Sequence, residues 1–270
     1  MAKEFIPALS YAGSYNLTFE EFLPMAEGRG FRSVQLTPDQ EPNLYTELQG
    51  QRLRELCHIK TSLGLEVHAH NVFYDINLVS LVPEVRQLAF DITKRVLEIS
   101  SALSTKTLTV HLGYMFPGWR SFKEQKDRFW QVVEQSVAHL ARLSKEYGVP
   151  ILLENGSYHL STATGPNRTP LHLGIAPDEM AHLVKLSDWQ LGVSLDINKA
   201  IHSGNPVMDF VTTLGSSIRE IQISTVKPYS ETIAGLLNAL PETGESRAVI
   251  LEGGLEEAND GRKLILERQR

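Results

Sequence analysis

The chain has 270 residues, of which 42% are hydrophobic and 21% are charged. This is ordinary globular usage, so collagen-like, low-complexity and largely disordered chains are excluded. The net charge of −6 argues against nucleic acid as the partner, because proteins that mainly bind a phosphate backbone usually carry an excess of basic residues. The single cysteine, Cys57, excludes an internal disulfide and a zinc site built from several thiolates. Without a signal-peptide pattern or an apolar run of membrane-spanning length, we expect a cytoplasmic protein that does not enter a membrane.

Eight short apolar runs recur along the chain and predict β-strands. They cover residues 5–12, 33–37, 65–71, 107–113, 150–156, 191–197, 218–224 and 248–254. Most are continuously apolar rather than alternating, which is typical of strands buried on both faces of a parallel sheet.

Helical patterns separate these runs. The expected helices cover residues 19–28, 43–63, 84–103, 126–147, 178–186, 207–214, 232–240 and the charged C-terminal segment 256–270. In the third of them, apolar residues recur every three or four positions from Val85 to Ile99, which indicates an amphipathic helix. Gly50 is a candidate interruption of the second.

Strands and helices alternate through residues 1–270 without a linker, and this predicts a single α/β domain folded as a (β/α)₈ TIM barrel. A long irregular stretch at about residues 157–177 is interpreted as an enlarged loop after the fifth strand. The competing architecture is an open, doubly wound sheet. That fold would normally show a glycine-rich phosphate turn after the first strand, and the segment from Tyr11 to Tyr15 is not one.

Polar side chains end six successive predicted strands, and in a TIM barrel the chemistry lies at these C-terminal ends. The side chains are His68 or His70, His111, Glu154, Asp196, Gln222 and Glu252. Three converging carboxylates repel one another unless a cation lies between them. Mixed histidine and carboxylate ligands suit zinc, manganese, iron or cobalt, so we expect a divalent metal ion of this kind. His68 and His70 point to the same face of their strand, and only one of them need be a ligand.

At these residues the sequence resembles the xylose-isomerase-like barrel superfamily. This group contains sugar and sugar-phosphate isomerases and epimerases, and also the apurinic endonucleases of the endonuclease IV family. The resemblance spans nearly the whole chain and rests on Val67-His68-Ala69 with Asn77-Leu78 downstream, Val110-His111-Leu112-Gly113, Leu153-Glu154-Asn155, Leu195-Asp196 and Leu251-Glu252-Gly253.

The resemblance implies two sets of metal ligands. His68, His111 and Glu154 match endonuclease positions that hold one zinc, with Glu154 shared with a second. Glu154, Asp196 and Glu252 match three of the four ligands in the isomerases and epimerases, where Glu154 and Glu252 also resemble the pair that moves protons on the two faces of the substrate. The fourth ligand there is usually a histidine; here it is Gln222, which can offer a carbonyl oxygen.

Two further departures from the family pattern affect the predicted chemistry. Lys199 stands where the family often has a histidine, and an ammonium group is not a metal ligand, so we expect it to neutralise a carboxylate or to contact an anionic substrate. Residues 225–231 lack the Asp-x-His motif that holds a third zinc in the endonucleases. Together with the acidic net charge, this argues against DNA repair.

We therefore predict a metal-dependent isomerase or epimerase of a sugar, sugar phosphate or related polyhydroxylated carbonyl compound, in which Glu154 and Glu252 move protons through a metal-stabilised enediolate. The expected substrate contacts are His70, Lys199, His202, Lys227, Tyr114 and Trp119. The alternatives are a lyase or dehydratase with the same centre, an apurinic-endonuclease-like phosphodiesterase, and a metal-free, non-catalytic barrel. A homo-oligomer is compatible with the sequence, which does not decide the oligomeric state.

Overall fold

The computed structural model describes residues 4–13, 16–41, 44–115, 123–158 and 172–269. Eight parallel strands pair in chain order to form a closed barrel. They are β1 (Phe5–Ser10), β2 (Ser33–Leu36), β3 (Glu66–His70), β4 (Leu108–Val110), β5 (Ile151–Glu154), β6 (Gly192–Asp196), β7 (Ile218–Ile223) and β8 (Arg247–Leu251). The predicted TIM barrel is confirmed, and the open sheet is excluded because β1 pairs with β8.

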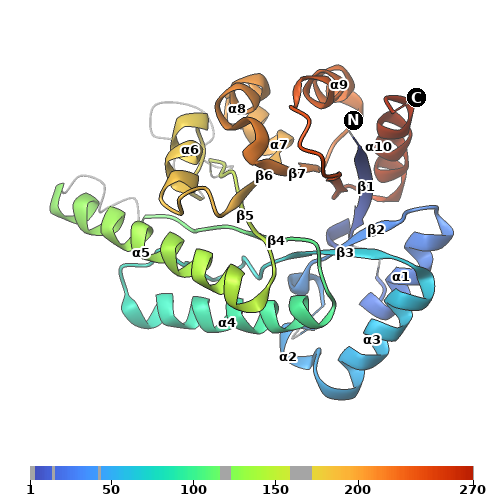
Figure 1. Ribbon diagram of the computed structural model, residues 1–270, viewed down its shortest axis with the longest axis horizontal. Coiled ribbons are helices and arrows are strands. Elements are labelled where there is room, and N and C mark those ends of the chain that lie inside the picture. Colours follow the sequence, from blue (N-terminus) through green and yellow to red (C-terminus); the bar gives the residue numbers. More distant parts are fainter. Residues whose placement is uncertain (1–3, 14–15, 42–43, 116–122, 159–171, 270) are drawn as a thin grey trace.

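Helices surround the barrel on the outside (Figure 1). They are α1 (Phe19–Gly28), α2 (Leu44–Glu47), α3 (Gly50–Leu63), α4 (Pro83–Ala102), α5 (Lys123–Tyr147), α6 (Pro177–Lys185), α7 (Ile197–His202), α8 (Val207–Leu214), α9 (Ser230–Ala239) and α10 (Leu255–Glu267). Figure 1 shows the two long helices α4 and α5 running side by side, and the contacts between them agree. None of the described helices has both the length and the apolar character that a membrane crossing requires.

Three details of the fold differ from the sequence prediction or extend it. The segment expected as one helix over residues 43–63 forms two, α2 and α3, and Gly50 begins the second with φ of +55°. Helix α7 was not expected, because six residues are too short to show a helical period. Of the predicted enlarged loop, residues 159–171 lie outside the described residues.

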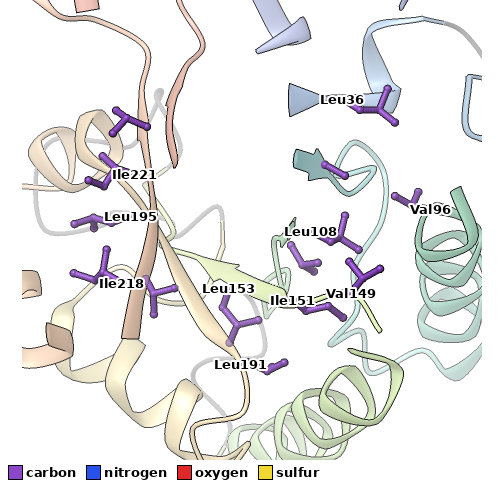
Figure 2. Packing of buried hydrophobic residues seen from close by; sticks show 14 of the residues in the cluster. Leu36, Val96, Leu108, Val149, Ile151, Leu153, Leu191, Leu195, Ile218 and Ile221 are labelled. Carbon is purple, nitrogen blue, oxygen red and sulfur yellow. The ribbon is translucent and has the colours of Figure 1, made fainter. Parts of the chain in front are cut away.

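The apolar core lies between the barrel and its helices. Figure 2 shows Val96 of α4 facing the strands, with Leu108 of β4 and Leu36 of β2 nearby. The inside of the barrel is different. Thr109 of β4 donates a hydrogen bond to Glu220 of β7 across the barrel at 2.6 Å, so polar side chains fill much of the interior, where branched apolar residues usually dominate.

Candidate active site

Glu154 stands at the centre of the polar cluster, at the end of β5, and its side chain is fully buried. Its Oε2 atom lies 3.0 Å from Nε2 of both His70 and His111. Its Oε1 atom accepts a hydrogen bond from Nζ of Lys199. Burial alone would raise the pKa of Glu154, but the charge of Lys199 and the hydrogen bond from His70 lower it below its usual range. Glu154 is therefore an anion, with one oxygen beside two imidazoles and the other beside an ammonium group.

His70 ends β3, and a backbone carbonyl fixes its ring. Nδ1 lies 2.7 Å from the carbonyl oxygen of Asn71, which can only accept, so Nδ1 carries a hydrogen. Nε2 can then donate to Glu154 when the ring is charged or offer a lone pair to a metal ion when it is neutral. Although burial lowers the pKa of His70, the hydrogen bond and charge of Glu154 raise it overall.

His111 follows β4, and its pKa is shifted in the opposite direction to that of His70. Burial, and then the positive charge of Lys199 at 3.4 Å from Nε2, hold the pKa of His111 well below its ordinary value. The ring stacks on His172 at 4.3 Å between centroids. Its buried Nδ1 has no hydrogen-bond partner among the described residues. His111 is thus a neutral imidazole with an unsatisfied polar atom.

His70, His111 and Glu154 together fit one divalent metal ion. Each offers a ligand atom, and these atoms lie within 4.8 Å of one another. A tetrahedral zinc with bonds of ~2.0–2.2 Å separates its ligands by roughly 3.3 Å, which is close to the 3.0 Å between Oε2 and each Nε2. A second ring nitrogen held by a backbone carbonyl, as in His70, is also the usual arrangement of a metal-bound imidazole.

The other carboxylates lie around Lys199 instead. Asp196 ends β6 and caps α7, with Oδ1 accepting from the backbone N–H of Lys199 at 2.8 Å. Its Oδ2 atom lies 3.3 Å from Nζ of Lys199. Burial lowers the pKa of Lys199, but the charges of Glu154 and Asp196 raise it overall, so the ammonium stays charged. Of the two carboxylates that contact the ammonium of Lys199, Asp196 is more distant than Glu154. Burial raises the pKa of Asp196.

Gln222 in β7 joins Glu154 to Glu252, which follows β8. In the amide orientation that pairs its nitrogen with acceptors, the nitrogen donates to Glu154 Oε1 at 3.1 Å and to Glu252 Oε1 at 3.0 Å, and the oxygen lies 3.1 Å from Ser194 Oγ. The carbonyl oxygen expected as a ligand therefore faces Ser194. Burial, and then the negative charge of Asp196, raise the pKa of Glu252 to about 7. The four-residue set of Glu154, Asp196, Gln222 and Glu252 does not fit a metal ion in this arrangement.

Two asparagines that sequence analysis did not assign to the site hold the strand ends together. Asn155 accepts from the backbone N–H of Asp196 at 2.7 Å and donates to its carbonyl oxygen at 3.1 Å. Asn198 accepts from the backbone N–H of Ser224 at 2.8 Å. The available signal was an asparagine close to two of the expected ligands, one residue after Glu154 and two residues after Asp196.

His68 lies deeper in the barrel, away from the cluster. Its Nδ1 atom is 2.7 Å from Thr107 Oγ1 and 3.3 Å from Glu220 Oε2. The structure thus places His70, rather than His68, beside His111 and Glu154. Both side chains point into the barrel, but two residues along a strand separate them by one layer, and only the upper layer reaches the rim.

A cavity of about 390 Å³ opens next to the cluster, within the size range of small-molecule sites. Its charged and polar lining includes His70, His111, Asp196, Lys199, His202 and Glu252. Glu154 does not line it, so the expected role of Glu154 as a proton-transferring partner of the substrate does not fit its position. An adjoining cavity of about 650 Å³ shares Phe73 and Tyr74 with the first and is largely apolar. The ionisable groups of the cluster, other than Glu154, line the smaller cavity.

The remaining predicted substrate contacts are distributed differently. His202 lines the polar cavity, and Tyr114 lines the apolar one. Lys227 lies 3.1 Å from Asp260 with 72% of its side chain exposed, and it lines neither cavity. Trp119 lies outside the described residues.

Comparison with known proteins places this site in context. Two solved structures similar to this chain are a D-tagatose 3-epimerase-like protein (TM-score 0.78, 20% identity, 98% of this chain and 96% of that chain) and a D-psicose 3-epimerase in the presence of D-fructose (TM-score 0.71, 16% identity, 98% and 96%). The IOLI protein with a binding zinc atom is also similar (TM-score 0.69, 12% identity, 98% and 96%). At these identities the likeness shows the fold.

Sequence comparison identifies the family. The uncharacterised protein MJ1311 of Methanocaldococcus jannaschii is 27% identical over 169 residues, which are 62% of this chain and 53% of that protein. The chain spans about half the length of the curated relatives it matches, or less. A family model described as the xylose isomerase-like TIM barrel matches residues 24–252. Because this match covers most of the chain, the protein belongs to the xylose isomerase-like TIM barrel family.

Proposed function

We propose that this protein is an isomerase or epimerase of a sugar or related polyhydroxylated carbonyl compound, acting by proton transfer next to the carbonyl group. One observation carries the proposal: Glu252 and Lys199 line the same cavity, so a proton acceptor and a fixed positive charge both reach the substrate. The fold similarity to sugar epimerases supports the substrate class.

Glu252 is the group we assign to proton transfer. A carboxyl group with a pKa of about 7 is matched to work near neutral pH, because a useful fraction is ionised and the group still binds the proton it removes. Removal of a proton next to a carbonyl places negative charge on the carbonyl oxygen. The ammonium of Lys199, fixed by Glu154 and Asp196, would stabilise that charge.

Glu154 acts, in this proposal, through the groups that it holds. It contacts Lys199, His70 and His111, and each of these three lines the cavity. His70, His111 and Glu154 would hold the divalent ion, which when bound would act as a Lewis acid on a substrate oxygen. This replaces the predicted pair of Glu154 and Glu252 by one proton-transferring carboxylate and one anchoring carboxylate.

The test is hydrogen exchange on ketose substrates. We would incubate the zinc-loaded protein in deuterated water with D-tagatose, D-psicose and D-fructose and follow the sugar protons by NMR. Loss of a proton signal next to the carbonyl, together with an isomer or epimer, supports the proposal. A dehydrated product would overturn it in favour of a lyase, the alternative that uses the same base. Absence of exchange with every ketose and with the corresponding aldoses, in a folded and zinc-loaded sample, would also overturn it.

A further inference from the structure

We infer that the ammonium of Lys199 is a built-in cation that fills a second ion position, so that Glu154, Asp196 and Glu252 are kept together without a divalent ion among them. The inference does not rest on the proposed function, because it concerns only which cation the carboxylates bind.

The two oxygens of Glu154 define two cation positions. Oε2 faces the two imidazoles, where the trio His70, His111 and Glu154 can hold an ion. Oε1 faces Nζ of Lys199, whose other neighbours are Asp196 Oδ2 at 3.3 Å and His111 Nε2 at 3.4 Å. An ion bound to Oε1 and Asp196 would have to lie ~2.0–2.2 Å from each oxygen, in the space that Nζ takes.

The balance of charges also argues against a second divalent ion. When all three carboxylates are ionised, their charge of −3 is matched by one divalent ion at the trio and one ammonium. A second divalent ion would leave an excess positive charge in a buried cluster, which is costly when it is not compensated. Among the described lysines and arginines, Lys199 is the one whose nitrogen lies within 4.0 Å of a Glu154 or Asp196 oxygen.

Gln222 independently argues against a second divalent ion. A ligand must offer a lone pair, whereas this amide presents N–H groups to Glu154 and Glu252. Its register partner in the sheet is Asp196, and its nitrogen donates to the same Glu154 oxygen, Oε1, as the ammonium of Lys199. Two donors, one from α7 and one from β7, therefore satisfy the carboxylates that a second ion would otherwise bind.

Local structure explains why Lys199 can do this. Asp196 caps α7, and the cap hydrogen bond fixes the backbone of Lys199 at 2.8 Å from Asp196 Oδ1. The side chain then returns over the cap to Glu154, with 26% of it exposed to the cavity. The lysine is thus positioned from a helix that begins at one of the carboxylates it neutralises.

The experiment counts bound ions. Wild type, Lys199→Ala and the double variant Lys199→Ala/Gln222→His would be dialysed against zinc and then against metal-free buffer, and zinc per chain measured by elemental analysis, with circular dichroism to confirm folding. We expect each variant to bind one more zinc ion per chain than wild type, and the double variant to hold it more tightly. Lys227→Ala is the matched control, because it removes a lysine paired with Asp260 outside the cavities, and its zinc content should equal that of wild type.

The difference in zinc content is the readout, so the result is independent of whether the trio itself binds zinc or the enzyme acts on sugars. Equal zinc in wild type and a folded Lys199→Ala would overturn the inference. If neither Lys199→Ala nor Lys199→Ala/Gln222→His folds, titration of wild type with cobalt decides. Saturation at one cobalt ion or fewer per chain supports the inference, and saturation at two overturns it. Thermal melting gives a second readout, since zinc should raise the melting temperature of the variants more than that of wild type.

Discussion

The barrel encloses two buried histidine–glutamate pairs, one layer apart. In the lower pair, His68 Nδ1 lies 3.3 Å from Glu220, and in the upper pair, His70 Nε2 lies 3.0 Å from Glu154. The residue types, the strand β3 and the degree of burial are shared. The surroundings differ in how completely the polar atoms are satisfied.

Glu220 belongs to a closed network. It accepts hydrogen bonds from Thr107 at 2.7 Å, Thr109 at 2.6 Å and Ser194 at 2.8 Å. Burial alone would raise its pKa, but the hydrogen bond and charge of His68, followed by the threonine hydroxyls, lower the pKa of Glu220 to about 2. Such a network stabilises one arrangement of its side chains.

The upper pair belongs to an open cluster. His111 Nδ1 lacks a partner among the described residues, and the pKa of Glu252 is raised to about 7 at the edge of a cavity. The candidate centre is therefore distinguished from the lower pair by its unsatisfied polar groups, because the two pairs consist of the same residue types.

Replacing the proton-transferring carboxyl should give the largest effect. Glu252→Gln keeps the shape of the side chain but removes the base, so we expect the turnover of a ketose substrate to fall by about 10²–10⁴-fold, the usual contribution of general base catalysis. The rate is measured by NMR exchange. Activity within tenfold of wild type would show that another group moves the proton.

The two histidines of β3 should separate in metal binding. His70→Ala removes a ligand atom, and we expect zinc affinity to fall by more than roughly 100-fold, because loss of a group that merely supports a ligand already costs 10–100-fold. His68→Ala is the matched control at the neighbouring inward position and should leave zinc affinity unchanged. Competition with a chromophoric chelator measures both. Equal losses in the two variants would contradict the assignment of the trio.

The lower pair should respond in stability instead. Glu220→Gln replaces a buried carboxylate oxygen, which accepts from Thr107, Thr109 or Ser194, by an amide nitrogen that cannot accept. We expect the free energy of unfolding to fall by about 1–3 kcal/mol, the usual cost of leaving a buried polar group unsatisfied. Urea denaturation measures the change. Activity per folded molecule should remain near that of wild type, so a folded but inactive variant would show that this layer takes part in the chemistry.

The sequence could predict the barrel because strands buried on both faces are recognisable as apolar runs. It could also place Glu154, Asp196 and Glu252 on one rim, because parallel strands end together. The choice between His68 and His70 could not be made, since it depends on Thr107 and Glu220, which reach His68 across the barrel from distant parts of the chain.

Local sequence patterns also could not predict where strands end or where short helices form. The run 107–113 forms a strand only at Leu108–Val110, and Gly113 has φ of +104°, which strand backbone does not adopt. Helix α7 has six residues, too few for a period, yet it delivers Lys199 to the carboxylates. The sequence showed that a lysine, Lys199, stands where the family often has a histidine. Only the folded structure shows that its ammonium contacts two carboxylates, Glu154 and Asp196.

The smallest expected effects are opposite pH dependences of stability. Glu252 has a folded pKa of about 7 against an ordinary value of 4.5, so the folded state keeps a proton that the unfolded chain loses, and this contribution to stability declines as pH rises from about 4.5 to 7. Glu220, lowered to about 2, contributes stability above its ordinary pKa that is lost as pH falls towards 2. Melting temperatures of Glu252→Gln and Glu220→Gln should therefore diverge from wild type in opposite directions. The first should gain on wild type by a few degrees between pH 5 and pH 8, while the second should lose less against wild type at pH 3 than at pH 6. Parallel curves for wild type and Glu252→Gln would mean that Glu252 titrates at an ordinary pKa and that its environment does not prepare it as a base.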